Sequence, residues 1–230
     1  MGGIADLGGT EGWGPVHPPP RHEPVFPEVW EGRAFALSLL AMGRVSGQNL
    51  DAFRYALGRL DRAAYLDDGY YGRWLNAIEL MLVESGILAP GAIDARARNL
   101  RGEQVEEPSV PEPTKPDYAA TAPGSLRTVD AAPAFAVGDP VRARAAAGEG
   151  AARLPGYVCG HAGVVDVVQP AALLPDTHAL FQAENPQHVY SVRFDSHELW
   201  GWRAEPFHLT IELYESYLEP AAGITVGITA

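Results

Sequence analysis

The sequence predicts an α+β protein with helices in its N-terminal half and a small β-barrel or roll in its C-terminal half. Apolar residues recur at helical spacing in the first hundred residues, residues 101–126 are rich in charge and proline, and short strand-like segments follow. We therefore expect an extended arm at 1–27, a helical domain at 28–100, a linker at 101–130, an SH3-like β-barrel domain at 131–220 and a tail at 221–230.

The N-terminal arm is defined by its glycine content. Six glycines fall between residues 2 and 16, and three prolines follow at 18–20. Glycine permits backbone conformations that other residues avoid, but ordering a glycine-rich segment is entropically unfavourable. We expect an extended segment whose ordering is compensated by contact with a partner surface.

The first two helices follow from spacing and capping residues. The first is expected to begin near Glu28 and to end near Gly43. Asn49 is a suitable N-cap for a second, short helix. In that helix Arg54 lies four residues after Leu50, so we expect Arg54 beside an apolar stripe.

The third helix has the clearest pattern, and a short fourth helix is expected after Pro90. Gly86 is expected to end the third helix. The helical spacing is carried by Trp74, Ile78, Met81, Leu82 and Ser85. The charged, proline-rich stretch that follows cannot bury a core and indicates a linker.

Strand signals begin beyond the linker. A turn at Gly138-Asp139 lies within residues 135–144, and further apolar or alternating runs lie at 164–168, 189–194 and 209–213. Short strands separated by turns are typical of a small barrel or roll.

Composition excludes several classes of protein. The net charge of −12 argues against a nucleic-acid-binding surface, which needs clustered Lys and Arg. A single cysteine, Cys159, excludes an internal disulfide and a multi-cysteine metal site. No apolar run reaches membrane length and no signal peptide is recognisable, so we expect a soluble, cytoplasmic protein.

The chain has no recognisable self-sufficient active site. We find no Walker-type loop, dinucleotide-binding fingerprint or nucleophile elbow. His197-Glu198 begins like a zinc-protease motif, but Gly201 stands where the second histidine would be required. A structural histidine is therefore favoured, and we assign no metal ligand to this chain.

Several segments, in matching order along nearly the whole chain, resemble the beta subunit of nitrile hydratase. The glycine-rich start carries part of this resemblance, and the remainder lies at 50–54, 65–74, 153–163, 189–194 and the Glu-Leu-Trp-Gly sequence at 198–201. Each motif alone is weak, whereas the ordered set is specific. The resemblance covers both the helical half and the strand-rich half.

The resemblance implies a partner alpha subunit that binds cobalt(III) or iron(III) in a cysteine-rich claw, with two cysteines oxidised to sulfinic and sulfenic acids. It also implies a heterodimer that pairs to a heterotetramer. By position, Arg54 and Arg153 correspond to the arginines that hold the cysteine oxygens. A planar guanidinium suits such anionic acceptors better than a lysine ammonium does. Gly156 and Cys159 stand where relatives often carry further arginines, so the local positive charge is lower here.

The same resemblance gives Tyr70 a hydroxyl role in the active-site hydrogen-bond network, with Tyr71 as its competitor, and makes Leu50, Phe53 and Trp74 an apolar wall for the nitrile. Each of these residues could also have a purely structural role, with no part in an active site. Arg54 could lie on a solvated helix face or pair with Asp51, and the aromatic and aliphatic side chains could simply pack between helices.

The implied activity is hydration of small-molecule nitriles to amides, performed by this chain together with alpha and not by this chain alone. The metal would act as a Lewis acid toward the nitrile or toward water, and an oxidised cysteine would serve as nucleophile or base. The alternatives are a non-catalytic assembly or metal-delivery protein, disfavoured by the strand-rich half, and a thiocyanate hydrolase-like subunit, disfavoured because a linker joins the two halves.

Overall fold

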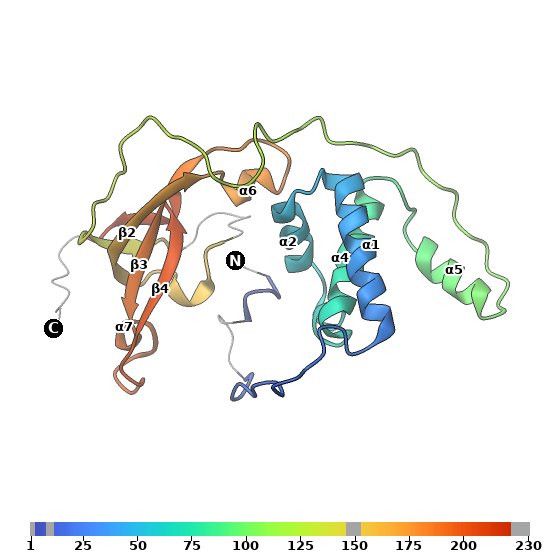
Figure 1. The fold of residues 1–230 in the computed structure, drawn as a ribbon, viewed down its shortest axis with the longest axis horizontal. Coiled ribbons are helices and arrows are strands. Elements are labelled where there is room, and N and C mark those ends of the chain that lie inside the picture. The colour runs from blue at the N-terminus through green and yellow to red at the C-terminus, as the bar shows by residue number, and fades with distance from the viewer. Residues whose placement is uncertain (1–2, 8–11, 146–152, 222–230) are drawn as a thin grey trace. The chain divides into compact units, whose positions relative to one another are not determined.

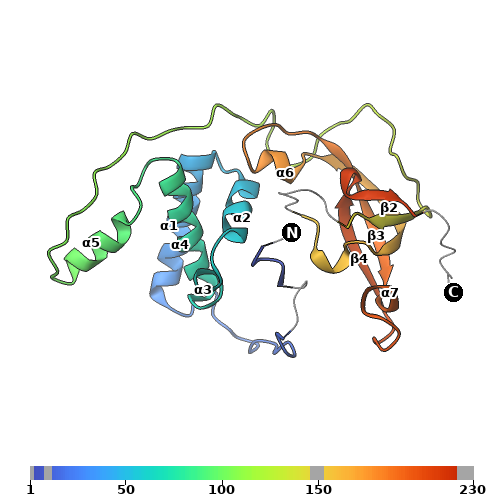
Figure 2. The same cartoon turned by 180° about the vertical axis from the view of Figure 1, so that it is seen from behind.

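The computed structural model describes residues 3–7, 12–145 and 153–221. The chain divides into two compact units (Figures 1 and 2). The helical unit is Gly14–Ala119, and the β unit combines Met1–Trp13 with Ala120–Ala230. Each unit is described by itself.

The helical unit is built around its fourth helix. α1, α2 and α3 all pack against α4, and α1 runs beside α4 in both views (Figures 1 and 2). The helices are α1 (Val29–Ser46), α2 (Leu50–Gly58), α3 (Arg62–Leu66), α4 (Gly69–Glu84) and α5 (Ala92–Leu100). The short α3, capped by Asp61, was not expected from the sequence.

The predicted start of α1 is confirmed and its predicted end is wrong. Glu28 is the N-cap, and its backbone N–H donates to Glu31 at 2.9 Å. The helix continues through Gly43 to Ser46, because Gly47 supplies the left-handed conformation (φ 59°) that ends a helix. A glycine inside a helix is unfavourable but does not stop it.

The α2 cap is confirmed, since the Asn49 side chain accepts a hydrogen bond from the Ala52 N–H at 3.0 Å. The buried residues of α2 are Ala52, Phe53 and Ala56. Leu50 is 60% exposed and Arg54 is also exposed. The apolar side chain four residues before Arg54 therefore lies at the surface instead of in the core.

The predicted end of α4 and the predicted helix after Pro90 are also confirmed. Gly86 follows α4 with φ 68°, and α5 begins two residues after Pro90. A Cβ at Gly86 would lie 2.7 Å from the Glu112 carbonyl oxygen, so the chain after α5 returns across the end of α4. Thr114 donates its N–H to the Ser85 carbonyl there, at 2.8 Å.

Between Leu100 and Pro140, all of it described, the chain forms neither helix nor strand apart from one isolated bridge that joins Leu126 to Ala172. The segment around that bridge lies against the sheet. Arg127 donates its N–H to Ala171, and Leu173 donates to Ser125, both at 2.9 Å.

The β unit contains a five-stranded antiparallel sheet in the order β4-β3-β2-β1-β5. Its strands are β1 (Pro140–Ala143), β2 (Ala162–Ala172), β3 (Gln187–Asp195), β4 (His208–Tyr214) and β5 (Leu218–Pro220), with short helices α6 (Pro175–His178) and α7 (Ser196–Trp200). β5 was not expected, whereas the expected turn at Gly138 (φ 92°) is present and β1 follows it.

The sheet encloses a core of large side chains. The residues at 0–2% exposure include Val192, Phe194, Tyr190, Leu213 and Tyr217. Over the part of the chain that the structure describes, β4 and β5 are the two edges and the sheet is open. The α+β prediction is confirmed, whereas closure into an SH3-like barrel stays a prediction.

Part of the predicted arm contacts the β unit itself. The Asp6 carboxylate accepts a hydrogen bond from the Gly156 N–H at 2.8 Å. Contact of the arm with a partner stays a prediction, and residues 1–2 and 8–11 of the arm lie outside the described residues. Most of the predicted tail also lies outside them, and Ala221 bonds to Pro140 at 3.1 Å.

Candidate functional site

Trp74 on α4 is the centre of an aromatic cluster that contains three of the predicted site residues. Its ring centroid lies 5.0 Å from that of Phe53 and 5.8 Å from that of Tyr70. The ring centroids of Phe35 and Tyr71 lie 5.7 and 6.0 Å from that of Trp74. Ring pairs at these separations attract beyond simple area burial, so α1, α2 and α4 are held together at this point.

Leu50 and Arg54 lie on α2, the helix that contributes Phe53 to this cluster. Phe53 is 3% exposed, whereas Leu50 and Arg54 are at the surface. One short helix thus presents an apolar and a cationic side chain outward while Phe53 fixes its position against Trp74. The fold brings Leu50, Phe53, Arg54, Tyr70 and Trp74 into two packed helices, α2 and α4.

Exposure separates the two candidate tyrosines. Tyr70 is 57% exposed at the start of α4, and the Arg73 guanidinium carbon lies 5.6 Å from its ring centroid. Tyr71 is less exposed and packs against the rings of Phe26 and Phe35, with centroid separations of 5.2 and 6.2 Å. Tyr70 is therefore the side chain of the pair that an external group can reach.

Arg153 belongs to the β unit and lies just before a firmly anchored segment. Leu154 is 1% exposed, and Val158, in the short 3-10 helix Gly156–Val158, is fully buried. These two anchors leave Arg153 half-buried at the edge of the core. The segment is tied further by the bond from Gly156 to Asp6 and by a bond from the Arg142 guanidinium to the Gly160 carbonyl at 2.5 Å.

Cys159 is a partly buried thiol. Its Sγ lies 3.4 Å from the Pro155 carbonyl oxygen. Burial raises the pKa of the Cys159 thiol above its usual range. At neutral pH the side chain is therefore neutral.

The His197-Glu198 pair has a structural role. A His197 ring nitrogen lies 3.0 Å from the Ala204 carbonyl oxygen, across the turn after α7. The Glu198 carboxylate accepts from the Ala162 N–H at 3.0 Å and lies 3.4 Å from His161. The contacts with Ala204 and Ala162 fasten α7 to neighbouring backbone. Among the residues that the structure describes, no three His, Cys, Asp or Glu side chains form a cluster that could hold a metal ion.

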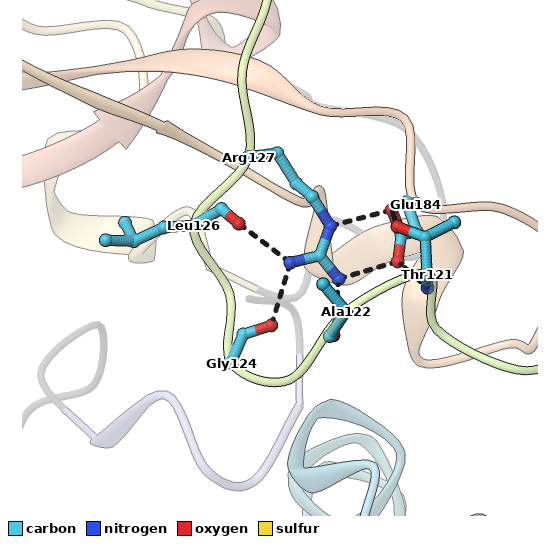
Figure 3. A network of polar contacts seen from close by, with 6 residues as sticks. All are labelled: Thr121, Ala122, Gly124, Leu126, Arg127 and Glu184. Atoms are coloured by element: carbon cyan, nitrogen blue, oxygen red, sulfur yellow. Dashed lines mark hydrogen bonds and ion pairs between the residues drawn. The ribbon is translucent and has the colours of Figure 1, made fainter.

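An Arg127–Glu184 ion pair, which the sequence did not indicate, holds the end of the linker (Figure 3). Arg127 donates two hydrogen bonds to the Glu184 carboxylate, at 2.6 and 2.7 Å, and three more to backbone carbonyls. Thr121 donates its N–H and its hydroxyl to the same carboxylate. The bond from Arg127 is the main reason that the pKa of Glu184 falls to about 2. The two residues are too far apart in sequence for any local pattern to pair them.

None of the described helices combines the length and apolarity needed to cross a membrane.

Comparison with known proteins assigns both halves of the chain to one family. Residues 1–122 match the model described as nitrile hydratase beta subunit, N-terminal, and residues 124–220 match nitrile hydratase beta subunit, C-terminal. The nitrile hydratase subunit beta of Pseudomonas putida is 38% identical over 225 residues, covering 96% of this chain and all of that protein. The low-molecular weight cobalt-containing nitrile hydratase subunit beta of Rhodococcus rhodochrous is 37% identical, with the same coverage.

A cobalt-containing nitrile hydratase subunit beta from Pseudonocardia thermophila is 35% identical over 95% of this chain and 96% of its own length. Among solved structures, recombinant apo thiocyanate hydrolase from Thiobacillus thioparus matches 39% of this chain and 78% of its own, at 27% identity and a TM-score of 0.37. The two family models and the near full-length relatives agree, and the chain belongs to the nitrile hydratase beta subunit family.

Proposed function

We propose that this chain is the beta subunit of a cytoplasmic nitrile hydratase and hydrates nitriles to amides together with a metal-bearing alpha subunit. The observation that carries this proposal is the near full-length similarity to nitrile hydratase beta subunits, in matching order through both halves. The relatives named as cobalt-containing favour cobalt(III) over iron(III) as the metal in alpha. We expect the heterodimer to pair to a heterotetramer.

The metal, bound by alpha, would supply Lewis acidity to the reaction. The residues of this chain suit a supporting role, because its described part offers no ligand cluster of its own. Arg54 and Arg153 would donate hydrogen bonds to the sulfinate and sulfenate oxygens of alpha. Their fixed, planar donors hold such anions in one geometry, which a flexible ammonium does less well.

The aromatic cluster would form the apolar side of the substrate pocket. Leu50 and Trp74 would contact the organic group of the nitrile, and Phe53 would hold α2 at the correct position against Trp74. The exposed Tyr70 would place its hydroxyl where it orients water or a cysteine oxygen. The prediction of a closed SH3-like barrel belongs to the same proposal.

The test is co-expression with an alpha chain that carries a Cys-x-x-Cys-Ser-Cys sequence, in medium containing cobalt, with a purification tag on the present chain. We expect a coloured metal complex that forms amide from nitrile. Arg54→Lys should reduce kcat by about 100-fold, as loss of a donor aimed at a reacting anionic group does. Arg44→Lys, on the exposed surface of α1, is the matched control and should keep full activity.

Failure to retain any cysteine-claw partner would contradict the proposal. The chain would then fit the assembly or metal-delivery reading better. A complex that forms and contains metal but is equally active with Arg54→Lys would contradict the role of Arg54 and leave the subunit assignment intact.

A further inference from the structure

Arg73 of α4 is a half-buried cation to which the proposed function gives no part. Its guanidinium carbon lies over the ring of Tyr65, 4.6 Å from the centroid, and over the ring of Tyr70, 5.6 Å from the centroid. A guanidinium within about 6 Å of a ring centroid is attracted by the negative face of the ring. One cation therefore contacts two tyrosines, and one of these is the candidate site residue Tyr70.

The two rings are the main partners of the Arg73 guanidinium. None of the carboxylates in the described part of the chain forms an ion pair with it. Its Nε donates one long hydrogen bond, at 3.4 Å, to the Gly69 carbonyl. A hydrogen bond of that length is weak, so the ring contacts do most to hold the guanidinium in place.

Tyr65 is the anchored member of the pair. It is 9% exposed and lies on α3, which packs beside the beginning of α4 (Figure 2). The Asn76 side-chain amide of α4 donates to the Ala64 carbonyl of α3 at 2.8 Å and holds the two helices together. The short helix α3 thus supplies a fixed ring against which Arg73 lies.

Tyr70 is the member that needs support. It is 57% exposed and is the second residue of α4. The N-cap Asp68 makes no side-chain bond to the first turn, and its carboxylate instead accepts from the Asn76 amide at 2.9 Å. The end of a helix without a side-chain cap is less firmly held, so the contacts of the Tyr70 ring carry more of its positioning.

The Tyr70 ring is braced by two side chains of its own helix. Arg73 and Trp74 lie three and four residues after Tyr70, a spacing that places all three on one face of α4. Trp74 joins the exposed ring to Phe53 of α2, and Arg73 joins it to Tyr65 of α3. Tyr70 is therefore linked to a buried aromatic side chain of each neighbouring helix.

We propose that Arg73, backed by Tyr65, is a positioning residue that fixes the ring of Tyr70 and thereby the direction of its hydroxyl. A tyrosine hydroxyl stands at the end of a rigid ring, so its place follows from how the ring is held. A displacement of about 1 Å at a catalytic centre can lower the rate about 100-fold. The inference rests on the proposed role of Tyr70 and deepens it by naming the residues on which that role depends.

The experiment is a double-mutant cycle on Arg73 and Tyr70 in the complete complex with alpha, with kcat and KM for a nitrile measured per bound metal. Arg73→Met removes the cation but keeps an unbranched side chain with good helix propensity. We expect kcat to fall about 3- to 10-fold with little change in KM, because the lost group acts on the hydroxyl and not on the nitrile. In Tyr70→Phe, which has no hydroxyl to position, Arg73→Met should change kcat by less than about 2-fold.

Two further variants control for the loss of a cation. Arg73→Lys keeps a cation near the rings and should lose less activity than Arg73→Met. Arg59 in the same unit has its guanidinium carbon 4.7 Å from the ring centroid of Tyr55, on α2. Arg59→Met thus removes the same kind of contact from a different tyrosine and should leave kcat within about 2-fold of the wild type.

Three results would overturn the inference. The first is an equal loss of kcat from Arg73→Met with and without the Tyr70 hydroxyl, since Arg73 would then act on the fold alone. The second is a loss no larger than that in Arg59→Met. The third is a rise in KM at unchanged kcat, which would indicate direct contact of Arg73 with the nitrile.

Tyr70→Phe alone separates this inference from the proposed function. A hydroxyl that orients water or a cysteine oxygen should contribute about 100-fold to kcat. If Tyr70→Phe is fully active, the proposed role of Tyr70 has failed, and the positioning inference fails with it. If Tyr70→Phe lowers kcat while Arg73→Met behaves like Arg59→Met, the role of Tyr70 stands and the positioning inference alone is overturned.

Discussion

The two units of this chain differ in how much they bury. Among the described residues, the largest fully buried side chains belong to the β unit with the single exception of Ser38. Half of the buried hydrophobic residues of the helical unit are alanines, namely Ala34, Ala41, Ala52, Ala56, Ala77 and Ala95, and the other half are Met42, Val45, Phe53, Tyr65, Ile78 and Met81. Its large apolar side chains are frequently exposed, as in Leu40 at 74% and Leu37 at 54%.

This difference in buried side chains bears on the internal stability of each unit. Burial of large apolar side chains is the main favourable term in folding, so the β unit has the stronger internal core. An apolar helix surface that remains exposed is typical of a protein that acts with a partner. We therefore expect the helical unit to supply more of the apolar surface for a partner than the β unit does.

The largest expected effect is at the centre of the β core. Phe194 is fully buried, so Phe194→Ala should destabilise the chain by about 3–5 kcal/mol, from lost burial and the cavity that remains. Leu37→Ala on the exposed face of α1 should change stability by less than about 0.5 kcal/mol. Urea unfolding of the purified variants, followed by circular dichroism, measures both. Equal losses of unfolding free energy in the two variants would contradict the difference between the two units.

The second effect concerns the Arg127–Glu184 pair, which fastens the linker to the β unit (Figure 3). The pKa of Glu184 is lowered from 4.5 to about 2, chiefly by the bond from Arg127. Its contribution to stability is therefore fully present above about pH 4.5 and is lost as the pH falls toward 2. After allowance for solvent screening, we expect Glu184→Gln to destabilise the chain by about 2 kcal/mol at pH 7 and to flatten this acid dependence.

A surface pair in the helical unit provides the control for Glu184. Glu107 bonds to Asn99 and Arg96 and is exposed. Glu107→Gln should leave the stability at pH 7 nearly unchanged, as exposed pairs usually do. The unfolding free energies of both variants are measured between pH 2 and pH 7. The same pH profile in Glu184→Gln and Glu107→Gln would contradict the stabilising role of the Arg127–Glu184 pair.

Sequence and structure agree best where the signal is local. The Asn49 cap, the Glu28 start of α1 and the glycine after α4 depend on neighbouring residues alone, and the structure confirms them. The end of α1 was misplaced because Gly43 and Gly47 look alike in sequence, and only the backbone conformation distinguishes them.

The candidate site divides in the same way. Leu50, Phe53 and Arg54 were placed on one short helix from spacing, which the structure bears out, although their functional roles stay predictions. Contacts between distant segments gave no sequence signal. The bond between Tyr217 and Asp176 joins residues 41 positions apart, and that between Arg127 and Glu184 joins residues 57 apart.

A smaller effect is expected at Leu50, in the unit with the exposed surface. Because Leu50 is already 60% exposed, Leu50→Ala should hardly alter the stability of the isolated chain. If it contacts the nitrile in the assembled enzyme, kcat/KM for an aliphatic nitrile should fall about 5- to 10-fold, as the loss of a few apolar groups in a pocket does. Leu100→Ala, at a comparably exposed site on α5, should leave kcat/KM unchanged. Equal effects of the two changes on turnover would remove Leu50 from the pocket.

The smallest expected effect is a gain in the stability of the helical unit. Gly43 lies within α1, and a Cβ built there would meet no atom within 4 Å. Gly43→Ala should therefore stabilise the helical unit by about 0.5–1 kcal/mol, because alanine loses less backbone entropy in a helix. Gly47 also has open space, but its φ of 59° is strained for alanine, so Gly47→Ala should destabilise by about 1 kcal/mol. Thermal unfolding should show opposite shifts for the two variants. If both substitutions shifted the unfolding temperature in the same direction, the backbone conformations of Gly43 and Gly47 in α1 would not be what determines the stability of the helical unit.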